Sequence, residues 1–474
     1  MAPMELRDLE VLVVGLGRSG VAAAELCLAH GARVTVNDSR SADALREPLA
    51  VLDGRAQLSL GGHPEARFTA AQLIVLSPGV PPLPALDAAR AAGVPIIGEI
   101  ELAARFVEAP IVAITGTNGK STTTTLVGAM LDESGLPTFV GGNLGTPLAD
   151  AVRLGHPAVG VGGRVVLELS SFQLETVAEF RAHVAALLNL SEDHLDRYPD
   201  YEAYRAAKAR IFERQREIDF AVVNGRDDQA MCRALAARSH AQKLSFAGAR
   251  GDDEDAPGAF FAHDPQSGTA LVLRLPQEEI DERYEASAMR IAGQHNRENA
   301  LAALLIARVA GATPDACARV LSQFRGLPHR MQRVAAIGDV LFYNDSKATN
   351  VGSVVGSIGG FERPVVLIAG GKHKGGDYGP LRDIVAEVCT HVVLIGAAAD
   401  LIAEALDGSA ELHRAPTLEE AVRQAHQLAR PGDAVVLSPA CSSYDMFSNY
   451  EERGARFVEA VRALAVELGE SQPS

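Results

Sequence analysis

The chain has 474 residues, enough for about three domains of ordinary size, which excludes a mini-protein. Hydrophobic residues make up 47% and charged residues 22%, with 44 Gly and 24 Pro, so the composition is that of a globular protein and argues against a disordered or fibrous chain. The formal charge of −16 argues against nucleic-acid binding by phosphate neutralisation. Any phosphate site must therefore be local, with its own cations.

The cysteines and the N-terminus bear on the cellular compartment. Five cysteines without a C-x-x-C pair fit neither a disulfide framework nor a zinc ribbon, and they indicate a reducing environment. The first residues, MAPMELRDLEVLVVG, lack the pattern of an export signal, and no apolar run reaches about 18 residues. We therefore expect a cytoplasmic protein with no membrane partner.

Short apolar runs followed by a glycine turn and a helical segment recur in chain order. The pattern begins with LEVLVVG and VAAAELCLAHG, and continues with PIVAITG and TTTTLVGAMLDESG. It returns late in the chain as RPVVLIAGG, THVVLIGAAADLIAEAL and DAVVLSPA. This rhythm is typical of parallel strands covered by helices, so we predict an α/β protein from end to end.

Interruptions of this rhythm predict three domains. Breaks near 107–110 and 326–328 separate a Rossmann-like domain (1–107), a central P-loop domain with a mostly parallel sheet (108–326) and a Rossmann-like C-terminal α/β domain (327–474). Residues 243–289 contain the acidic turn GDDEDAPG and the alternating run ALVLRL. We predict an antiparallel insertion there, within the middle domain.

The first glycine-rich loop, GLGRSG at 15–20, follows the strand VLVV and opens a helix. Asp38 closes the next strand, VTVND, about twenty residues later, which is the dinucleotide-binding arrangement. Glycines allow close approach of a ligand, the helix N-terminus attracts an anion, and Asp38 can accept a hydrogen bond from a hydroxyl group. A tight structural turn is the alternative, and the acidic residue indicates a hydroxyl-bearing ligand without naming a cofactor.

The second loop, TGTNGKST at 115–122, lies between the strand PIVAI and a helix that begins near the threonine run. Its backbone N–H groups can cradle phosphates, Lys120 can reach the terminal phosphate, and the hydroxyl of Ser121 or Thr122 can bind Mg²⁺. Ile114 takes the place of the first glycine of the usual P-loop, so this is a short variant. A helix-capping turn is the weaker interpretation.

Several segments resemble the Mur ligase family, the ATP-dependent amino-acid ligases of peptidoglycan synthesis. They are GTNGKST at 116–122, ELSSFQLE at 168–175, NLSEDHLDRYPDYEAYRAAKARIF at 189–212, GQHNRENALAA at 293–303, GLPHR at 326–330 and NDSKATN at 344–350. GGNLGTPL at 141–148 and SPACSSYDMFSNYEERG at 438–454 resemble the branch that adds D-glutamate to UDP-N-acetylmuramoyl-L-alanine, and the D-N-P-R motif of members that add a diamino acid is absent. The resemblance implies those two small-molecule substrates and a bacterial cytoplasmic enzyme, which we expect to be a monomer.

The resemblance also implies a mechanism. An amide does not form from a carboxylate with oxide as leaving group, so ATP must first convert the carboxylate into an acyl phosphate, and Mg²⁺ neutralises charge during that transfer. The implied catalytic residues are Lys120, Glu168, His194, Lys208 and Arg330. The implied metal ligands are Ser121, Glu168, His194 and, if carbamylated, Lys208. By pattern alone, Glu168 would be a solvated strand cap and His194 a turn residue.

Lys208 is by composition a surface lysine on a helix that starts near Asp200. The family carries a carbamylated lysine at the matching position. At an effective dielectric constant near 20, an ammonium about 4 Å from a divalent ion is repelled by roughly 8 kcal/mol. A carbamate would instead attract a second metal ion, so the resemblance implies two Mg²⁺ ions.

Three groups of binding residues complete what the resemblance implies. The ATP-binding residues are Gly116, Thr117, Asn118, Gly119, Lys120, Ser121, Thr122, Asn296, Asn299, Arg330, Asp345 and Lys347. The UDP-sugar residues are Ser19, Asp38, Ser39, Arg40, Gly79 and Asn143. The D-glutamate residues are Thr349, Lys374, Ser443 and Tyr450, although the branch usually has Phe at the last position and Lys372 competes with Lys374 within GGKHKGGDY. Asn296 and Asn299 have helix N-capping as their plain alternative.

Two other functions compete with the ligase. A nicotinamide oxidoreductase would rest on GLGRSG alone and would leave the phosphate loop, His194 and Lys208 without a role. A P-loop ATPase that acts as a regulator or partner-binding module would hydrolyse ATP without a UDP-sugar.

Overall fold

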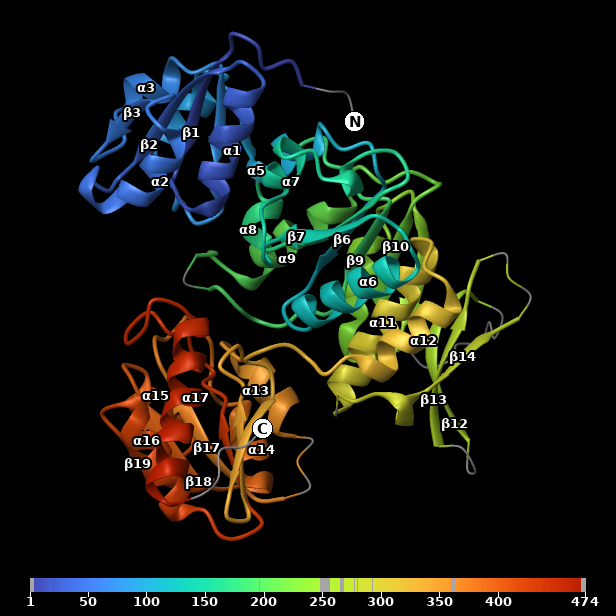
Figure 1. Cartoon of the computed structure of the whole chain (residues 1–474), viewed down its shortest axis with the longest axis vertical. Coiled ribbons are helices and arrows are strands. Elements are labelled where there is room, and N and C mark those ends of the chain that lie inside the picture. The colour runs from blue at the N-terminus through green and yellow to red at the C-terminus, as the bar shows by residue number, and fades with distance from the viewer. Residues whose placement is uncertain are drawn as a thin grey trace. The chain divides into compact units, whose positions relative to one another are not determined.

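The computed structural model describes residues 4–195, 197–247, 256–264, 268–276, 278, 280–291, 293–359, 361 and 363–469. The chain forms two compact units. The first comprises residues 1–190, 202–288 and 299–322, and the second comprises residues 191–201, 289–298 and 323–474. The first unit contains two sheets and the second contains one, among the residues described (Figure 1).

The N-terminal sheet is entirely parallel, with strand order β3-β2-β1-β4-β5. Its strands are β1 (Glu10–Val14), β2 (Arg33–Asp38), β3 (Gln57–Leu60), β4 (Leu73–Leu76) and β5 (Ile96–Gly98). The helices are α1 (Arg18–Ala29), α2 (Arg46–Leu52), α3 (Glu65–Thr69), α4 (Pro84–Ala91) and α5 (Glu99–Ala104). From β1 the chain adds β2 and β3 on one side and then β4 and β5 on the other, so the strand order reverses between β1 and β4. The loops that follow these two strands therefore open a crevice at the carboxyl edge of the sheet.

The central sheet has the order β14-β13-β12-β11-β10-β9-β6-β8-β7 and is parallel from β7 to β12. Its strands are β6 (Ile111–Thr115), β7 (Thr138–Gly142), β8 (Arg164–Glu168), β9 (Val184–Leu187), β10 (Phe220–Asn224), β11 (Gln242–Phe246), β12 (Gly258–Asp264), β13 (Gly268–Arg274) and β14 (Glu282–Glu285). Its helices are α6 (Lys120–Glu133), α7 (Leu148–Arg153), α8 (Ser171–Leu174), α9 (Tyr201–Ala209), α10 (Ala230–Ala236), α11 (Gln294–Val309) and α12 (Pro314–Gln323). All residues of β6 are buried, so both faces of this strand are covered, as a parallel strand between two layers of helices requires.

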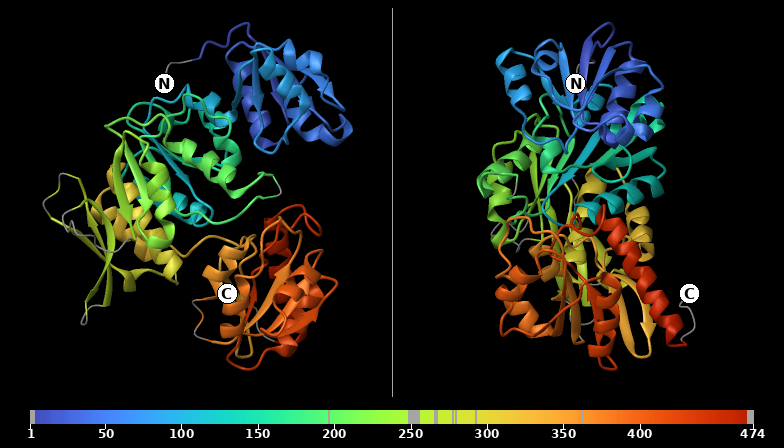
Figure 2. Two further views of the ribbon diagram at one scale, coloured as in Figure 1. Left: turned by 180° about the vertical axis from the view of Figure 1, so that it is seen from behind. Right: turned by 90° about the vertical axis from the view of Figure 1, so that its left-hand side faces the viewer.

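The predicted antiparallel insertion is confirmed, but it begins later than residue 243. β11 pairs in parallel with β10, and β12 pairs in parallel with β11, so among the described strands of the central sheet only β12, β13 and β14 form antiparallel pairs. This ribbon extends the edge of the central sheet, as the yellow-green strands in Figure 2 show. Residues 251–255 of the predicted acidic turn lie outside the described residues.

The C-terminal sheet has the order β15-β16-β20-β17-β18-β19, and only the β15–β16 pair is antiparallel among its described strands. The strands are β15 (Gln332–Ile337), β16 (Val340–Asn344), β17 (Val365–Gly370), β18 (Cys389–Ile395), β19 (Glu411–Arg414) and β20 (Ala434–Leu437). Apolar residues of α16 (Leu418–Leu428) and α17 (Tyr450–Glu467) cover one face. Those of α13 (Val351–Ile358), α14 (Leu381–Val388) and α15 (Ala399–Ala405) cover the other.

Short 3₁₀ helices connect some of these elements. They are η1 (Asp43–Leu45), η2 (Pro157–Val159), η3 (Arg210–Phe212), η4 (Asp227–Gln229) and η5 (Ala286–Ala288). The three sheets span residues 10–98, 111–285 and 332–437, so each falls within one predicted domain. The exact domain boundaries stay a prediction.

All five cysteines are free and buried, and burial raises the pKa of each thiol. That pKa is about 12 for Cys27, Cys232, Cys317 and Cys389, and about 11 for Cys441. Among the described residues, no helix combines the length and the apolar character that a membrane crossing requires.

Candidate active site

The second glycine-rich loop connects the carboxyl end of β6 to the first residue of α6, as predicted. Gly116 and Gly119 have φ angles of +154° and +81°, which favour glycine. A Cβ atom at Gly119 would lie 2.2 Å from the side-chain oxygen of Asn299, so even alanine does not fit without a shift. Gly119 therefore lets the loop pack closely against Asn299 of α11, and as the N-cap it leads into α6, whose N-terminal N–H groups favour an anion.

Asn189 fixes the shape of this loop from the neighbouring strand end. Its side-chain oxygen accepts the Asn118 N–H at 2.8 Å, and its amide donates to the Asn118 carbonyl at 3.1 Å. The Lys120 Nζ donates to the carbonyls of Gly116 at 2.8 Å and Thr117 at 2.7 Å. Sequence reasoning did not select Asn189, although it opens the segment NLSEDH.

Glu168 ends β8 and pairs in register with Ile114 of β6, directly before the phosphate loop. Its side chain is 2% exposed, so the interpretation of a solvated strand cap is wrong. Asn143 donates to its Oε1 at 2.7 Å. Ser121 is 1% exposed at the start of α6, so the loop contains a buried hydroxyl, and a buried carboxylate lies beside the strand end that leads into it. Oxygen ligands of this kind fit Mg²⁺.

Lys208 contacts the same loop from α9. Its side chain is 2% exposed, which shows that the interpretation of a surface lysine is wrong. Its Nζ donates to the Gly116 carbonyl at 2.9 Å and lies 4.8 Å from the centre of the Tyr204 ring. The Tyr204 hydroxyl lies 3.1 Å from Thr117 Oγ1. The amines of Lys120 and Lys208 thus face one carbonyl oxygen of the loop.

All six predicted UDP-sugar residues line one cavity of about 510 Å³ at the carboxyl edge of the N-terminal sheet. They are Ser19, Asp38, Ser39, Arg40, Gly79 and Asn143. The Asp38 carboxylate accepts the Leu16 N–H at 2.8 Å and is paired with the Arg40 guanidinium at 2.8 Å. Burial alone would raise the pKa of Asp38, but the hydrogen bonds from Arg40 and Leu16 hold it well below its usual range. The loop after β2 thereby fastens the first glycine-rich loop.

In the second unit, Asp193 joins two predicted residues. Its Oδ1 accepts the His194 N–H at 2.9 Å and the Lys374 Nζ at 3.2 Å, and its Oδ2 accepts the Asn350 amide at 3.2 Å. His194 has a φ of +57°, and its Nε2 lies 3.7 Å from Asp193 Oδ2. Lys372 is exposed while Lys374 is largely buried, so the structure distinguishes the two lysines. Asp193 directly precedes His194 in the chain, and this acidic neighbour is the local sequence signal for the contact.

Asp345 lies buried just after β16. Its carboxylate accepts the Met331 N–H at 3.2 Å and the Ser438 hydroxyl at 2.9 Å. Burial raises its pKa to about 6, against the hydrogen bonds from Ser357 and Ser438 and the charge of Arg330. A carboxyl group that titrates this close to neutrality can exchange a proton within the physiological range.

Lys347 and Tyr450 lie together in the same unit. The Lys347 Nζ sits 4.9 Å from the centre of the Tyr450 ring, a cation–π contact that a Phe would also provide. Thr349 donates its N–H to the Lys347 carbonyl at 2.9 Å, and Ser443 is 3% exposed. Lys347 and Thr349 follow the carboxyl end of β16, Ser443 follows that of β20, and Tyr450 is the first residue of α17.

Arg453 of α17 is a buried residue that sequence reasoning missed. It is 1% exposed and donates to the Ser346 hydroxyl at 2.9 Å, the Ser346 carbonyl at 2.7 Å and the Cys441 carbonyl at 3.2 Å. Burial lowers its pKa to about 10. Arg453 thus ties the loops after β16 and β20 to α17.

Asn296 and Asn299 lie inside α11, which begins at Gln294. Neither residue is therefore the N-cap, and the capping alternative is wrong. Asn299 places its side-chain oxygen against Gly119 of the phosphate loop.

Comparison with known proteins decides the family. A UDP-N-acetylmuramoylalanine–D-glutamate ligase of Geotalea daltonii is 47% identical over 464 residues, which cover 98% of this chain and 99% of that protein. The ligase of the same name from Anaeromyxobacter dehalogenans is 48% identical over 472 residues, with 98% and 99% coverage. The chain belongs to the Mur ligase family. The motifs quoted above had predicted this family, and the prediction is confirmed.

Family models cover each of the three sheets of this Mur ligase. The Mur ligase MurD-like N-terminal domain matches residues 9–98, the Mur ligase middle domain matches 114–307, and the Mur ligase glutamate ligase domain matches 329–441. MurF from Acinetobacter baumannii shares the fold with a TM-score of 0.58 at 20% identity, covering 96% of this chain and 92% of that one. The predicted fold class, α/β with three domains, is confirmed.

Proposed function

We propose that this Mur ligase joins D-glutamate to UDP-N-acetylmuramoyl-L-alanine in peptidoglycan precursor synthesis, converting ATP to ADP and phosphate. One observation carries the proposal: a phosphate loop, a buried carboxylate and a buried lysine converge at one edge of the central sheet, in a chain 47% identical along 98% of its length to a D-glutamate ligase. We also propose a cytoplasmic monomer with domain boundaries at 107/108 and 326/327.

The proposed chemistry activates a carboxylate with ATP. The loop N–H groups and Lys120 hold the phosphates, and the substrate carboxylate attacks the terminal phosphorus to give an acyl phosphate and ADP. The D-glutamate amine then attacks the acyl carbon, forms the amide and displaces phosphate. Positioning and charge neutralisation dominate such transfers. Mg²⁺, when bound, supplies positive charge to the phosphates, and Ser121, Glu168 and His194 would hold it.

We propose that Lys208 acts as its carbamate. The neutral amine attacks CO₂, an N–C bond forms and a proton is released, so a cation becomes an anion. Two observations support this: Lys208 is buried, and its amine faces the carbonyl that also accepts from Lys120. Two ammonium groups around one oxygen repel each other, and the carbamate removes this repulsion. It would also supply oxygen ligands for a second Mg²⁺.

The remaining residues receive proposed roles by group. For ATP they are Asn296, Asn299, Arg330, Asp345 and Lys347, with Arg330 supplying positive charge to the transferring group. For the UDP-sugar they are the six residues that line the 510 Å³ cavity. For D-glutamate they are Thr349, Lys374, Ser443 and Tyr450.

Phosphate release tests the proposed function. We expect release from ATP and Mg²⁺ only when UDP-N-acetylmuramoyl-L-alanine and D-glutamate are both present, and replacement of D-glutamate by other amino acids should abolish it. Lys120→Ala should abolish release, whereas Lys243→Ala in β11 should retain it. Release that is indifferent to both substrates would instead support a regulatory ATPase, and reduction of NAD would support an oxidoreductase.

A second experiment tests the carbamate. Lys208→Ala should lose activity and regain part of it when a short carboxylic acid is added, because the acid can place a carboxylate in the vacated space. Full activity of Lys208→Ala without added acid would remove this part of the proposal and leave the ligase assignment intact.

A further inference from the structure

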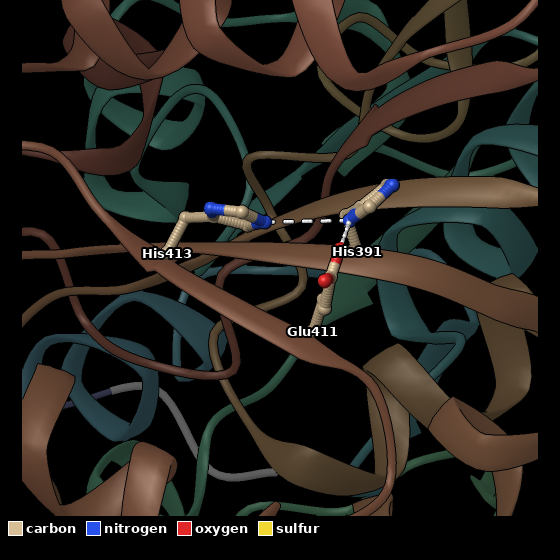
Figure 3. A group of neighbouring side chains, drawn as sticks. All are labelled: His391, Glu411 and His413. Atoms are coloured by element: carbon tan, nitrogen blue, oxygen red, sulfur yellow. Dashed lines mark hydrogen bonds and ion pairs between the residues drawn. The ribbon is translucent and has the colours of Figure 1, made fainter.

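Two imidazoles and a carboxylate meet on one face of the β18–β19 pair (Figure 3). His391 of β18 is the register partner of Glu411 of β19. His413 follows Glu411 by two residues, so the alternation of side chains along a strand places it on the same face. The parallel pairing of β18 and β19 therefore places the Cα atoms of all three residues so that their side chains lie on the same face.

The separations of the ligand atoms match those around a small transition-metal ion. His391 Nδ1 lies 3.0 Å from Glu411 Oε2 and 3.3 Å from His413 Nε2, and all three ligand atoms lie within 4.8 Å of one another. Two ligands about 2.0–2.2 Å from a tetrahedral Zn²⁺ lie about 3.3 Å apart. The two nearest contacts therefore need little adjustment to accept an ion between them.

Hydrogen bonding alone does not account for this arrangement. His391 Nδ1 carries at most one proton, and it can donate this proton in a hydrogen bond to Glu411. The Nε2 atom of His413 would then compete with Glu411 as an acceptor for the same proton. A salt bridge with a carboxylate that is 72% exposed contributes little to stability. A metal ion would instead use a lone pair from each of the three groups at once.

We propose that His391, Glu411 and His413 bind a divalent transition-metal ion, with Zn²⁺ the best match and a fourth position left to water. Two imidazole nitrogens and one carboxylate suit Zn²⁺, whereas Mg²⁺ prefers oxygen ligands only. His391 and Glu411 lie near the beginnings of β18 and β19, whereas Thr349, Lys374 and Ser443 come after the carboxyl ends of their strands, so this site is separate from the edge proposed to bind D-glutamate. Since β19 is the edge strand of its sheet, the ion would fasten it to β18.

Metal titration of the full chain tests the site. Zn²⁺ binding is followed by calorimetry, and Co²⁺ binding by its visible absorption, both in excess Mg²⁺ so that oxygen-rich sites are occupied. We expect one tightly bound ion per chain. Because loss of even an outer-shell partner lowers metal affinity by about 10- to 100-fold, the double variant His391→Gln/His413→Gln should lower it by at least about 100-fold.

Two controls make the result decisive. His240→Gln removes an exposed imidazole elsewhere and should bind Zn²⁺ like the wild type. The double variant should keep its ligase activity, which shows that it folds, and Zn²⁺ should raise the melting temperature of the wild type but not of the variant. If the double variant does not fold, Glu411→Gln provides the same test. Equal Zn²⁺ affinity in wild type and variant, or no Zn²⁺ binding by the wild type in excess Mg²⁺, would overturn the proposal.

Discussion

Removal of the Glu101 carboxylate should destabilise the first unit. Glu101 lies in α5 and is fully buried. Its Oε2 accepts three consecutive backbone N–H groups, those of residues 178, 179 and 180, at 2.9, 3.0 and 2.8 Å. Its Oε1 accepts the Arg105 Nε at 2.6 Å. One side chain thus connects the helix after the N-terminal sheet to the segment that leads into β9.

The expected loss follows from what Glu101→Ala leaves behind. Removing one partner of a buried ion pair costs about 3–5 kcal/mol, and each buried N–H left without an acceptor costs about 1–3 kcal/mol. Water can enter the vacated space and satisfy part of these donors. We therefore expect the free energy of unfolding to fall by about 4 kcal/mol for Glu101→Ala, and by about half as much for Glu101→Gln, which keeps one oxygen.

Urea denaturation followed by far-UV circular dichroism measures this change. Glu108→Ala, which removes an exposed carboxylate four residues after the end of α5, is the matched control and should change stability by less than about 0.5 kcal/mol. A loss of less than about 1 kcal/mol for Glu101→Ala would refute the reasoning, because it would mean that water satisfies all of these donors at no cost.

Three further predictions follow from the site. Gly119→Ala should lower kcat/KM for ATP more than tenfold, because a left-handed alanine costs about 1–2 kcal/mol and its Cβ meets Asn299. Gly135→Ala is the control: φ is +80° there, but nothing lies within 4 Å of the added Cβ. This variant should keep kcat/KM near that of the wild type in the same assay. Arg453→Met should lower the free energy of urea unfolding by about 2–4 kcal/mol through loss of its hydrogen bonds to buried acceptors, and unchanged stability would contradict the tie described for α17. The pKa of Asp345 rises from 3.8 in the unfolded chain to about 6 in the fold. Its contribution to stability is therefore fully present below pH 3.8 and is lost as the pH rises through about 6. Between pH 4 and pH 7 the wild type should therefore lose stability relative to Asp345→Asn. The loss should be about 3 kcal/mol at most, because one pKa unit corresponds to about 1.4 kcal/mol. Parallel pH profiles of stability for the two proteins would rule this out.

The sequence predicted best what depends on neighbours along the chain. Strand, glycine turn and helix follow one another locally, so both glycine-rich loops lie where their patterns place them. The predicted UDP-sugar residues line one cavity. Ser19 and Gly79 meet there because they follow β1 and β4, which flank a reversal of strand order, a general property of such sheets. Asp38, Ser39 and Arg40 come from the end of β2, and Asn143 comes from the end of β7.

Burial and long-range partners could not be predicted in this way. Lys208 has the local pattern of a surface lysine, and only the packing of α9 against the phosphate loop makes it 2% exposed. Asp193 accepts hydrogen bonds from residues 157 and 181 positions away in the sequence. Arg453 donates to Ser346, which is 107 positions away. The start of the antiparallel ribbon depends on which strand β11 joins, and alternation of side chains does not specify that.

The buried thiols have a practical consequence. A thiol whose pKa lies four to five units above pH 7 contains almost no thiolate at that pH. Alkylating reagents and mild oxidants should therefore leave the native chain unmodified. Cys27 belongs to the N-terminal layers, Cys232 and Cys317 to the central ones, and Cys389 and Cys441 to the last. The order in which an alkylating reagent labels these sulfurs under gentle denaturation would record, without any engineered cysteine, which part of the enzyme opens first.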